Sequence, residues 1–205
     1  MLIDLHNHTS RYSPCSVLEP PVLCAKAEAA GLDGIAITEH DTYFPQRHMT
    51  KLREHWEGRL VIFSGIEISI PGYHVLTFGA PIPAGPYHDL GSLRTAADAS
   101  SNALVLAHPF RWGAMHRFHS DRELLGFLRS FDAVEVFSMN LDASMQQDGH
   151  NFFTAHDIPM AAGSDAHSPE MCASYATRFS SRPQNDLELA AALRAGSFTP
   201  ERIRA

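Results

Sequence analysis

Short apolar runs alternate with longer amphipathic stretches along the whole chain. Seven of the apolar runs have the length of a strand. We therefore predict strands at Leu2–Leu5, Gly34–Thr38, Leu60–Ser64, Tyr73–Phe78, Ala103–Ala107, Ala133–Phe137 and Pro159–Ala162. Helices are predicted at Pro20–Ala30, Gln46–Glu57, Leu93–Ser101, Asp121–Phe131, Leu141–His156 and Leu187–Ala195.

Local signals support several of these boundaries. Pro20 suits the first turn of a helix, and Gly31 and Gly196 suit helix ends. Ser120 is expected to be an N-cap, because its hydroxyl can accept a hydrogen bond from a free backbone amide of the first turn. The Pro-Gly pair at 71–72 predicts a turn between two strands.

The regular order of strand then helix predicts an α/β protein with parallel strands wrapped by helices. Seven strands are close to the number that closes a barrel. No internal repeat or linker divides the chain, so residues 1–205 are expected to form a single domain. In such folds the functional groups lie at the carboxyl ends of the strands.

Composition excludes some classes of protein. The chain is 44% hydrophobic and 19% charged, which is typical of a globular protein. Its formal net charge of −7 disfavours extended binding to a nucleic acid backbone. Three cysteines and the lack of a membrane-spanning run or a leader before Asp4 predict a cytoplasmic protein with free thiols that does not enter membranes.

Histidines and carboxylates gather at the ends of the predicted strands. His6 and His8 follow the first strand, and residues two apart in an extended segment point to the same side. Later positions of the same kind are His40, Glu67, His108, Asp165 and His167. His74 differs, because it is near the start of its strand.

Each of these residues alone has an ordinary explanation, such as a hydrogen-bonded core histidine. Chance is a much weaker explanation for metal-ligand types at six strand ends. Side chains that converge in this way can bind a cluster of divalent metals, which activates water and neutralises anionic leaving groups. The other histidines that lie in polar or helical contexts are expected to be solvated: His48, His55, His88, His119, His150 and His156.

The order of these motifs resembles that of the PHP family, named for its polymerase and histidinol-phosphatase members. The family signatures D-L-H-x-H-T, I-T-D-H, G-x-E, H-P and S-D-A-H correspond to Asp4–Thr9, Ile37–His40, Gly65–Glu67, His108–Pro109 and Ser164–His167. Glu39 stands where the second signature has Asp. The matching motifs span residues 4 to 167.

This resemblance implies a distorted (β/α)7 barrel with two or three metal ions, usually Zn, Mn or Fe, at its carboxyl-end face. By position, His6, His8, Glu67 and Asp165 would hold the first ion. Glu67 would bridge to a second ion, which His74 and His108 complete. His40 and His167 would hold a third ion, or position substrate and water without it.

One departure from the family pattern concerns the third ion. Many members have an Asp or His shortly after the first motif, whereas residues 10–16 here contain neither. Arg11 and Tyr12 are candidates for contact with a substrate phosphate, and Cys15 is a candidate ligand for a soft metal or a small packed thiol. Centres with two and with three ions both stay open.

We therefore hypothesise the metal-dependent hydrolysis of a phosphomonoester of a small molecule or nucleotide. Asp165 or His167 would assist proton transfer, a third metal or His40 would stabilise the leaving oxygen, and Arg111 would clamp the phosphate. Asn140 is a candidate substrate contact or helix cap. Glu135, inside a predicted strand, is taken as structural. The aromatic cluster Phe110, Trp112, His116 and Phe118 suits either ring stacking or loop packing.

Two other classes stay open. One is a phosphodiesterase or exonuclease acting on nucleic acid, which the acidic balance disfavours. The other is a non-catalytic metal-binding module, which the nearly complete ligand set disfavours. The leaving group, the native metal and the oligomeric state have no signal in the sequence.

Overall fold

The computed structural model describes residues 1–111 and 118–203. The strands are β1 (Leu2–Asp4), β2 (Gly34–His40), β3 (Val61–Ile70), β4 (Tyr73–Gly79), β5 (Asn102–Ala107), β6 (Ala133–Phe137), β7 (Met160–Ala162), β8 (Tyr175–Phe179) and β9 (Phe198–Arg202). The helices are α1 (Pro20–Ala29), α2 (Gln46–His55), α3 (Leu90–Ala96), α4 (Asp121–Leu128), α5 (Ala143–Ala155) and α6 (Asp186–Ala195).

The described strands form one sheet in the order β7-β6-β5-β4-β3-β2-β1-β8-β9. The pairs β1–β2, β2–β3, β5–β6 and β6–β7 are parallel, whereas β4 is antiparallel to both of its neighbours. The expectation of parallel strands throughout was therefore wrong at β4. The Pro71–Gly72 turn, in which Gly72 has a φ of 90°, reverses the chain there.

Two strands were missed in the sequence. β8 pairs antiparallel with β1, and β9 pairs antiparallel with β8. Both have five residues and carry an exposed arginine, and β9 contains Pro200, so neither reads as an apolar run. The described part of the chain thus has nine strands rather than seven.

The sheet curves into a nearly closed barrel, which confirms the predicted barrel-like α/β class. At the carboxyl ends of the parallel strands, Asn7 pairs with Ala166, and the His8 amide donates to the Ala166 carbonyl at 3.0 Å. Lower down, the Thr177 hydroxyl joins β8 to β7: it accepts from the Ala162 amide at 2.8 Å and donates to the Ala162 carbonyl at 2.9 Å.

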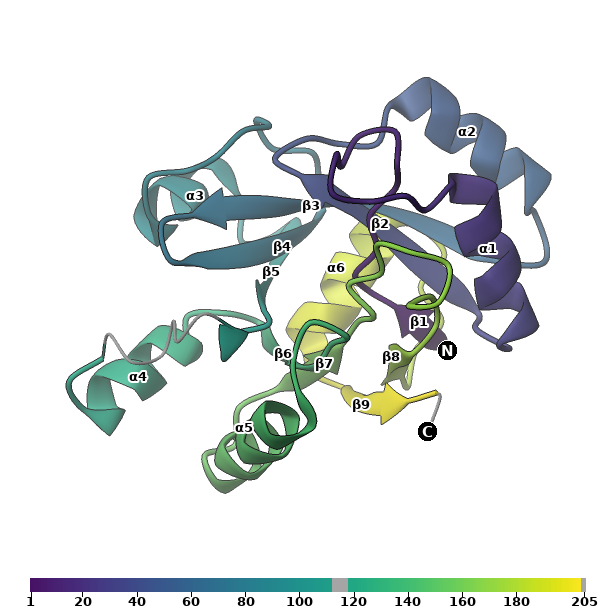
Figure 1. The fold of residues 1–205 in the computed structure, drawn as a ribbon. Helices are drawn as coiled ribbons and strands as arrows, with labels where there is room; N and C mark the ends of the chain where they lie inside the picture. Colours follow the sequence, from purple (N-terminus) through teal and green to yellow (C-terminus); the bar gives the residue numbers. More distant parts are fainter. Residues whose placement is uncertain (112–117, 204–205) are drawn as a thin grey trace.

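Helices cover the outside of the barrel in two groups. α1 and α2 lie along one side and α3, α4 and α5 lie toward the other, while α6 occupies the centre of the view (Figure 1). Ser120 caps α4 by accepting from the Glu123 amide, as predicted, and Gly196 ends α6 with a φ of 70°. Among the described residues, no helix has the length and apolar character needed to cross a bilayer.

The half of the barrel interior near the amino ends of the parallel strands is apolar. Ile3, Phe63, Leu76 and Phe78 pack there against Leu193 of α6. α6 therefore closes the barrel at the amino ends of the parallel strands, and the opposite end is left for polar side chains.

Candidate metal centre

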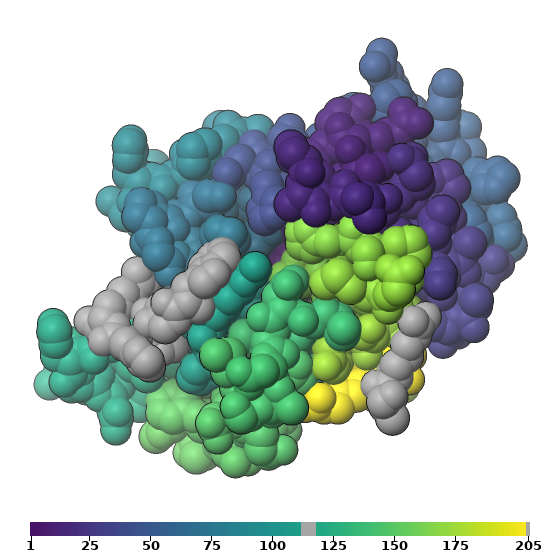
Figure 2. Space-filling model, in the orientation of Figure 1, coloured from purple at the N-terminus to yellow at the C-terminus, as the bar shows by residue number. Residues whose placement is uncertain are grey.

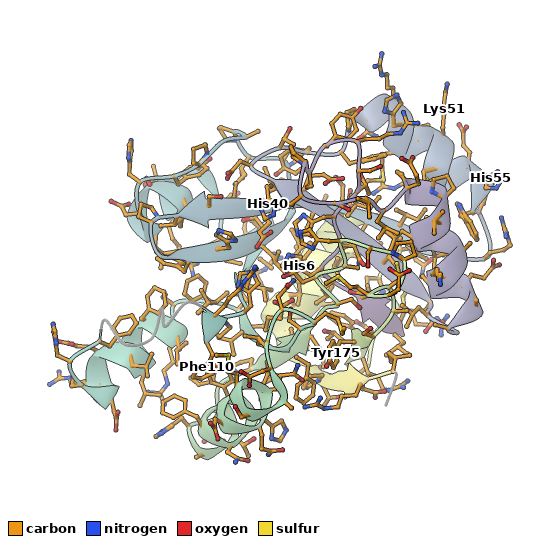
Figure 3. All side chains as sticks on the ribbon, in the orientation of Figure 1. His6, His40, Lys51, His55, Phe110 and Tyr175 are labelled. Atoms are coloured by element: carbon orange, nitrogen blue, oxygen red, sulfur yellow. The ribbon has the colours of Figure 1, made fainter. Side chains whose placement is uncertain are left out.

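The predicted ligands meet at the carboxyl ends of the parallel strands, where His6 lies near the centre of the molecule and His40 lies nearby (Figure 3). His6 and His8 follow β1 and are both fully buried. Their side chains point to the same side, and their Nε2 atoms are 3.0 Å apart. The extended geometry expected for this pair is therefore present.

Glu67 is the hub of the cluster. Its Oε2 atom lies 3.3 Å from His6 Nε2, 3.1 Å from His8 Nε2 and 3.0 Å from His40 Nδ1. Its Oε1 atom lies 2.8 Å from His74 Nδ1 and 3.1 Å from His108 Nε2. One buried carboxylate thus touches five imidazoles.

The position of Glu67 differs from the sequence interpretation. The predicted strand ends at Ser64, but β3 continues through Gly65 to Ile70. Gly65 is needed in this strand, because a Cβ atom there would come within 2.8 Å of the Phe78 ring. Glu67 therefore projects from the middle of a long strand.

The reversed strand explains His74. Because β4 is antiparallel to β3, its first residues lie beside the last residues of β3, and His74 is paired with Ser69. Directly opposed residues share a face of the sheet, as do residues two apart, so His74 and Glu67 point to the same side. The apparent exception in the sequence follows from strand direction.

Asp165 and His167 enter from the segment after β7. Asp165 Oδ1 is 3.4 Å from His6 Nε2 and 3.2 Å from His8 Nε2. His167 Nδ1 is 3.5 Å from Asp165 Oδ1, and Arg111 has one guanidinium nitrogen 3.8 Å from Asp165 Oδ2. The N-terminal segment and the segment after β7 also lie against each other on the surface (Figure 2).

These side chains form three overlapping groups, in each of which one possible ligand atom per residue lies within 4.8 Å of the others. The groups are His6, His8, Glu67 and Asp165; His40, Glu67 and His74; and His8, His40 and His167. The first is the set expected for a first ion. His40 joins Glu67 and His74 in the second, where the sequence interpretation had His108, although His108 also contacts Glu67.

Opposite charges dominate the electrostatics of this buried cluster. Burial alone would lower the pKa of His6, but Asp165, Glu135 and Glu67 raise it well above its ordinary value. Burial would raise the pKa of Asp165, but His6 and His8 hold it well below its usual range. The imidazoles of His6, His108 and His40 likewise hold the pKa of Glu67 well below its usual range. The carboxylates are therefore ionised and attract cations.

The donor set suits a divalent metal. Glu67 Oε2 is buried and accepts no hydrogen bond from the described residues, although three imidazole nitrogens lie within 3.3 Å of it. Imidazole nitrogens gathered around one buried carboxylate oxygen are an arrangement typical of metal ligands. Imidazole and carboxylate donors bind zinc, iron and manganese, and do not choose among them.

His108 has an uncommon backbone conformation. A residue before proline is usually extended, but His108, which precedes Pro109, has a φ of 29°. Its amide donates to Glu135 Oε2 at 3.0 Å, which holds the chain in this uncommon conformation. The carboxylates next to His40 in the sequence have other partners: Glu39 accepts from Thr9 and Ser13, and Asp41 accepts from the Ser69 amide.

Sequence reasoning missed two residues of the site. Glu135 was taken as structural, yet its Oε1 atom lies 3.0 Å from His6 Nδ1. Asn140 was expected to cap a helix or meet substrate, yet its side-chain amide donates to Asp165 Oδ2 at 2.6 Å. An acid inside the apolar run of β6 was the available signal for Glu135, because a buried charge requires a partner.

Several of the remaining candidates contact residues outside the cluster. Phe110 packs on Phe153 and Phe118 on Phe127, which favours loop packing over stacking with a ligand for these two rings. Trp112 and His116 lie outside the described residues. Tyr12 donates to or accepts from His48 Nδ1 at 3.0 Å, Arg11 lies 3.8 Å from Glu19, and Cys15 is exposed.

Comparisons with known proteins agree with the fold and the motifs. The family model described as PHP-associated matches residues 150–198. A comparison with curated protein sequences gives no match.

Three solved structures are similar to the chain over nearly its whole length. A two-domain protein from Bacteroides vulgatus, which contains a predicted PHP-like metal-dependent phosphoesterase, is 18% identical with a TM-score of 0.72, and the match covers 98% of this chain and 64% of that one. PsfC from Pseudomonas syringae is 17% identical with a TM-score of 0.71, covering 98% and 91%. An amidohydrolase from Chromobacterium violaceum with bound sulfate is 14% identical with a TM-score of 0.56, covering 98% of both.

The chain thus spans less than two thirds of the length of the Bacteroides vulgatus protein. At these identities the solved structures establish the fold. Together with the PHP-associated match they confirm the predicted resemblance to the PHP domain family, whose metal-dependent phosphoesterases are hydrolases.

Proposed function

We propose that the chain is a metal-dependent phosphatase that hydrolyses a phosphomonoester of a small molecule or nucleotide. The observation that carries this proposal is the convergence of five imidazoles on one buried carboxylate, Glu67, at the open end of the barrel. Two or three divalent ions, zinc, manganese or iron, would occupy this cluster.

Each group of the cluster has a proposed ion. His6, His8, Glu67 and Asp165 would hold the first, and Glu67 with His74, His108 and His40 the second. His8, His40 and His167 would hold a third ion where one is present. When bound, such ions supply Lewis acidity toward a phosphoryl group and lower the pKa of water.

Arg111 is proposed to clamp the phosphate. Its side chain is 31% exposed and reaches the edge of the cluster beside Asp165. A guanidinium group can bind two phosphate oxygens at once, so it would orient phosphorus toward the cluster.

In a centre without the third ion, His167 is proposed to accept a proton from the attacking water. Burial and the nearby His8 lower its pKa below the ordinary value, so its imidazole is neutral at pH 7 and can act as a base. Asn140 holds Asp165, the other candidate for this proton, by a hydrogen bond of 2.6 Å. His40, which is 30% exposed, would stabilise the leaving oxygen.

Charge and thiol chemistry support the choice of partner and compartment. The net charge of −7 favours a small phosphorylated substrate over nucleic acid. The three cysteines, an odd and sparse set, favour the cytoplasm, where thiols stay reduced.

The test is phosphate release from metal-stripped protein to which manganese, zinc or iron is returned. Sugar, amino-alcohol and nucleotide monophosphates form the substrate panel, and bis(p-nitrophenyl) phosphate reports diester cleavage. We expect release from one class of monoester above the others, and only after metal is added. Cleavage of the diester alone would contradict the proposal and favour a phosphodiesterase. Metal binding without any turnover would favour a binding module.

A further inference from the structure

Two buried carboxylates that are absent from the three metal-ligand groups lie behind the His6–His8 pair. Glu135, which is 1% exposed, stands behind His6, and Glu39, which is fully buried, stands behind His8. Each acts on the Nδ1 side of its imidazole, the side away from Glu67 and Asp165.

The contacts of Glu135 determine where His6 carries its proton. Glu135 Oε2 accepts from the His108 amide at 3.0 Å, and Oε1 lies 3.0 Å from His6 Nδ1. An ionised carboxylate only accepts hydrogen bonds, so Nδ1 of His6 must be the donor. The Nε2 atom of a neutral His6 then has a lone pair directed into the cluster.

His8 is fixed through a hydroxyl group. The Ser13 hydroxyl donates to Glu39 Oε2, which uses its single hydrogen. Its oxygen can therefore only accept from His8 Nδ1, 3.2 Å away, and it also accepts from the His40 amide at 3.4 Å. The Nε2 lone pair of His8 is directed into the cluster as well.

Gly163 leaves the space that the contact between Glu135 and His6 requires. A Cβ atom at Gly163 would come within 2.5 Å of His6 Cβ and 2.9 Å of Glu135 Oε1. Glycine at this position therefore lets Glu135 approach His6 behind the segment that carries Asp165.

When both imidazoles are neutral, their two Nε2 lone pairs face each other across 3.0 Å. A metal ion between them removes this repulsion, as does a proton on one ring in the metal-free protein, so metal ions compete with protons at this pair. We propose that Glu135 and the Glu39–Ser13 pair are positioning residues, which lock both imidazoles in the tautomer that binds a cation and so raise the metal affinity of the first group. This proposal rests on the metal centre of the proposed function but not on the reaction.

The experiment is a titration of metal-stripped protein with cobalt(II), followed by visible absorption. Glu135→Gln keeps the shape of the side chain but gives only one acceptor, so either His6 or the His108 amide faces an NH2 group. We expect cobalt to bind about 10–100-fold more weakly, as for other groups that orient metal ligands, and its absorption spectrum to change. Ser13→Ala should weaken cobalt binding at the lower end of that range, because it removes only the hydroxyl that links Glu39 to His8.

Two variants away from the cluster are matched controls. Asp186→Asn alters a carboxylate that, like Glu135, accepts a backbone amide, here from Ser64 at 2.8 Å. Thr77→Val removes a buried hydroxyl that has no hydrogen bond within the described residues. Both should shift the unfolding midpoint of the metal-free chain more than they shift cobalt affinity or the spectrum.

Cobalt affinity and a spectrum equal to wild type in Glu135→Gln and Ser13→Ala would overturn the proposal, as would a wild-type chain that binds no cobalt. If Glu135→Gln does not fold, Ser13→Ala decides the matter alone. Weaker cobalt binding by the variants, in a protein that releases phosphate from no monoester, would refute the proposed reaction and support the positioning role.

Discussion

The half of the barrel interior near the amino ends of the parallel strands is lined with Ile3, Phe63, Leu76 and Phe78, whereas the other half is lined with imidazoles and carboxylates. The apolar side chains are buried, as are His6, His8, Glu67 and Asp165 of the polar half, whereas His40, His74 and His167 are partly exposed. Burial of apolar surface stabilises the fold, but burial of charge is costly unless it is paired. The apolar half therefore stabilises the barrel, and this stability offsets the cost of holding charged groups close together in the polar half.

The largest effect is expected from Asp165→Ala in the polar half. Turnover should fall by more than about 100-fold, because loss of a group that merely orients a metal ligand already costs about 10–100-fold. Phosphate release measures this, and circular dichroism should show an intact fold. Asp33→Ala is the control, since Asp33 accepts from the Leu2 amide at the opposite end of the barrel. Full activity in Asp165→Ala would remove Asp165 from the site.

Phe78→Ala in the apolar half should have the opposite profile. Phe78 is 1% exposed in the interior cluster, and truncation of such a ring costs about 3–5 kcal/mol of unfolding free energy. Urea unfolding measures the loss, while metal affinity of the remaining folded protein should stay near that of wild type. A large fall in affinity with little loss of stability would show that the two halves are not separate in function.

The smallest effect concerns the reactivity of the three thiols. Cys15 lies in an exposed loop beside the polar half, whereas Cys24 and Cys172 are buried in the packing around the barrel. Cys15 is exposed, although partial burial raises its pKa somewhat, whereas burial raises the pKa of Cys24 to about 12. Cys24 therefore stays protonated at pH 8, and Cys172 is fully buried. We expect Ellman's reagent to titrate one thiol in the native protein and three in denaturant. Rapid reaction of all three thiols would indicate that the packing around Cys24 and Cys172 opens readily.

The fold was predictable as far as it rests on apolar runs. Six strands that run in the same direction, and the reversed β4, contain such runs, so their approximate positions could be found. Strand direction could not, because a turn such as Pro71–Gly72 reverses the chain without changing the run that follows. β8 was missed because Arg178 interrupts its apolar character, and β9 because Pro200 is typical of turns and edges.

The site was predictable where ligands follow strands in recognisable motifs. Asn140 and Glu135 were misread because their partners, Asp165 and His6, are 25 and 129 residues away. Ser13 was missed for a related reason: only folding brings the loop that carries it between His8 and Glu39. A residue that supports a metal ligand lies at no fixed number of residues from that ligand. His6 and His8, in contrast, are two residues apart and form a recognisable motif.

The Thr177 hydroxyl has a consequence for the motions of the barrel. β7 and β8 are joined by side-chain hydroxyls, that of Thr177 and that of Ser164 just after β7, instead of a ladder of backbone hydrogen bonds. Local opening at this seam would break fewer bonds than opening elsewhere in the sheet, so nearby amides should exchange hydrogen sooner than those of β3. Asp165 follows β7 directly, whereas Glu67 and His74 are held by the β3–β4 ladder. Breathing at the seam would therefore move one wall of the candidate metal centre and leave the other in place, and it would give the proposed ions a path into a buried site.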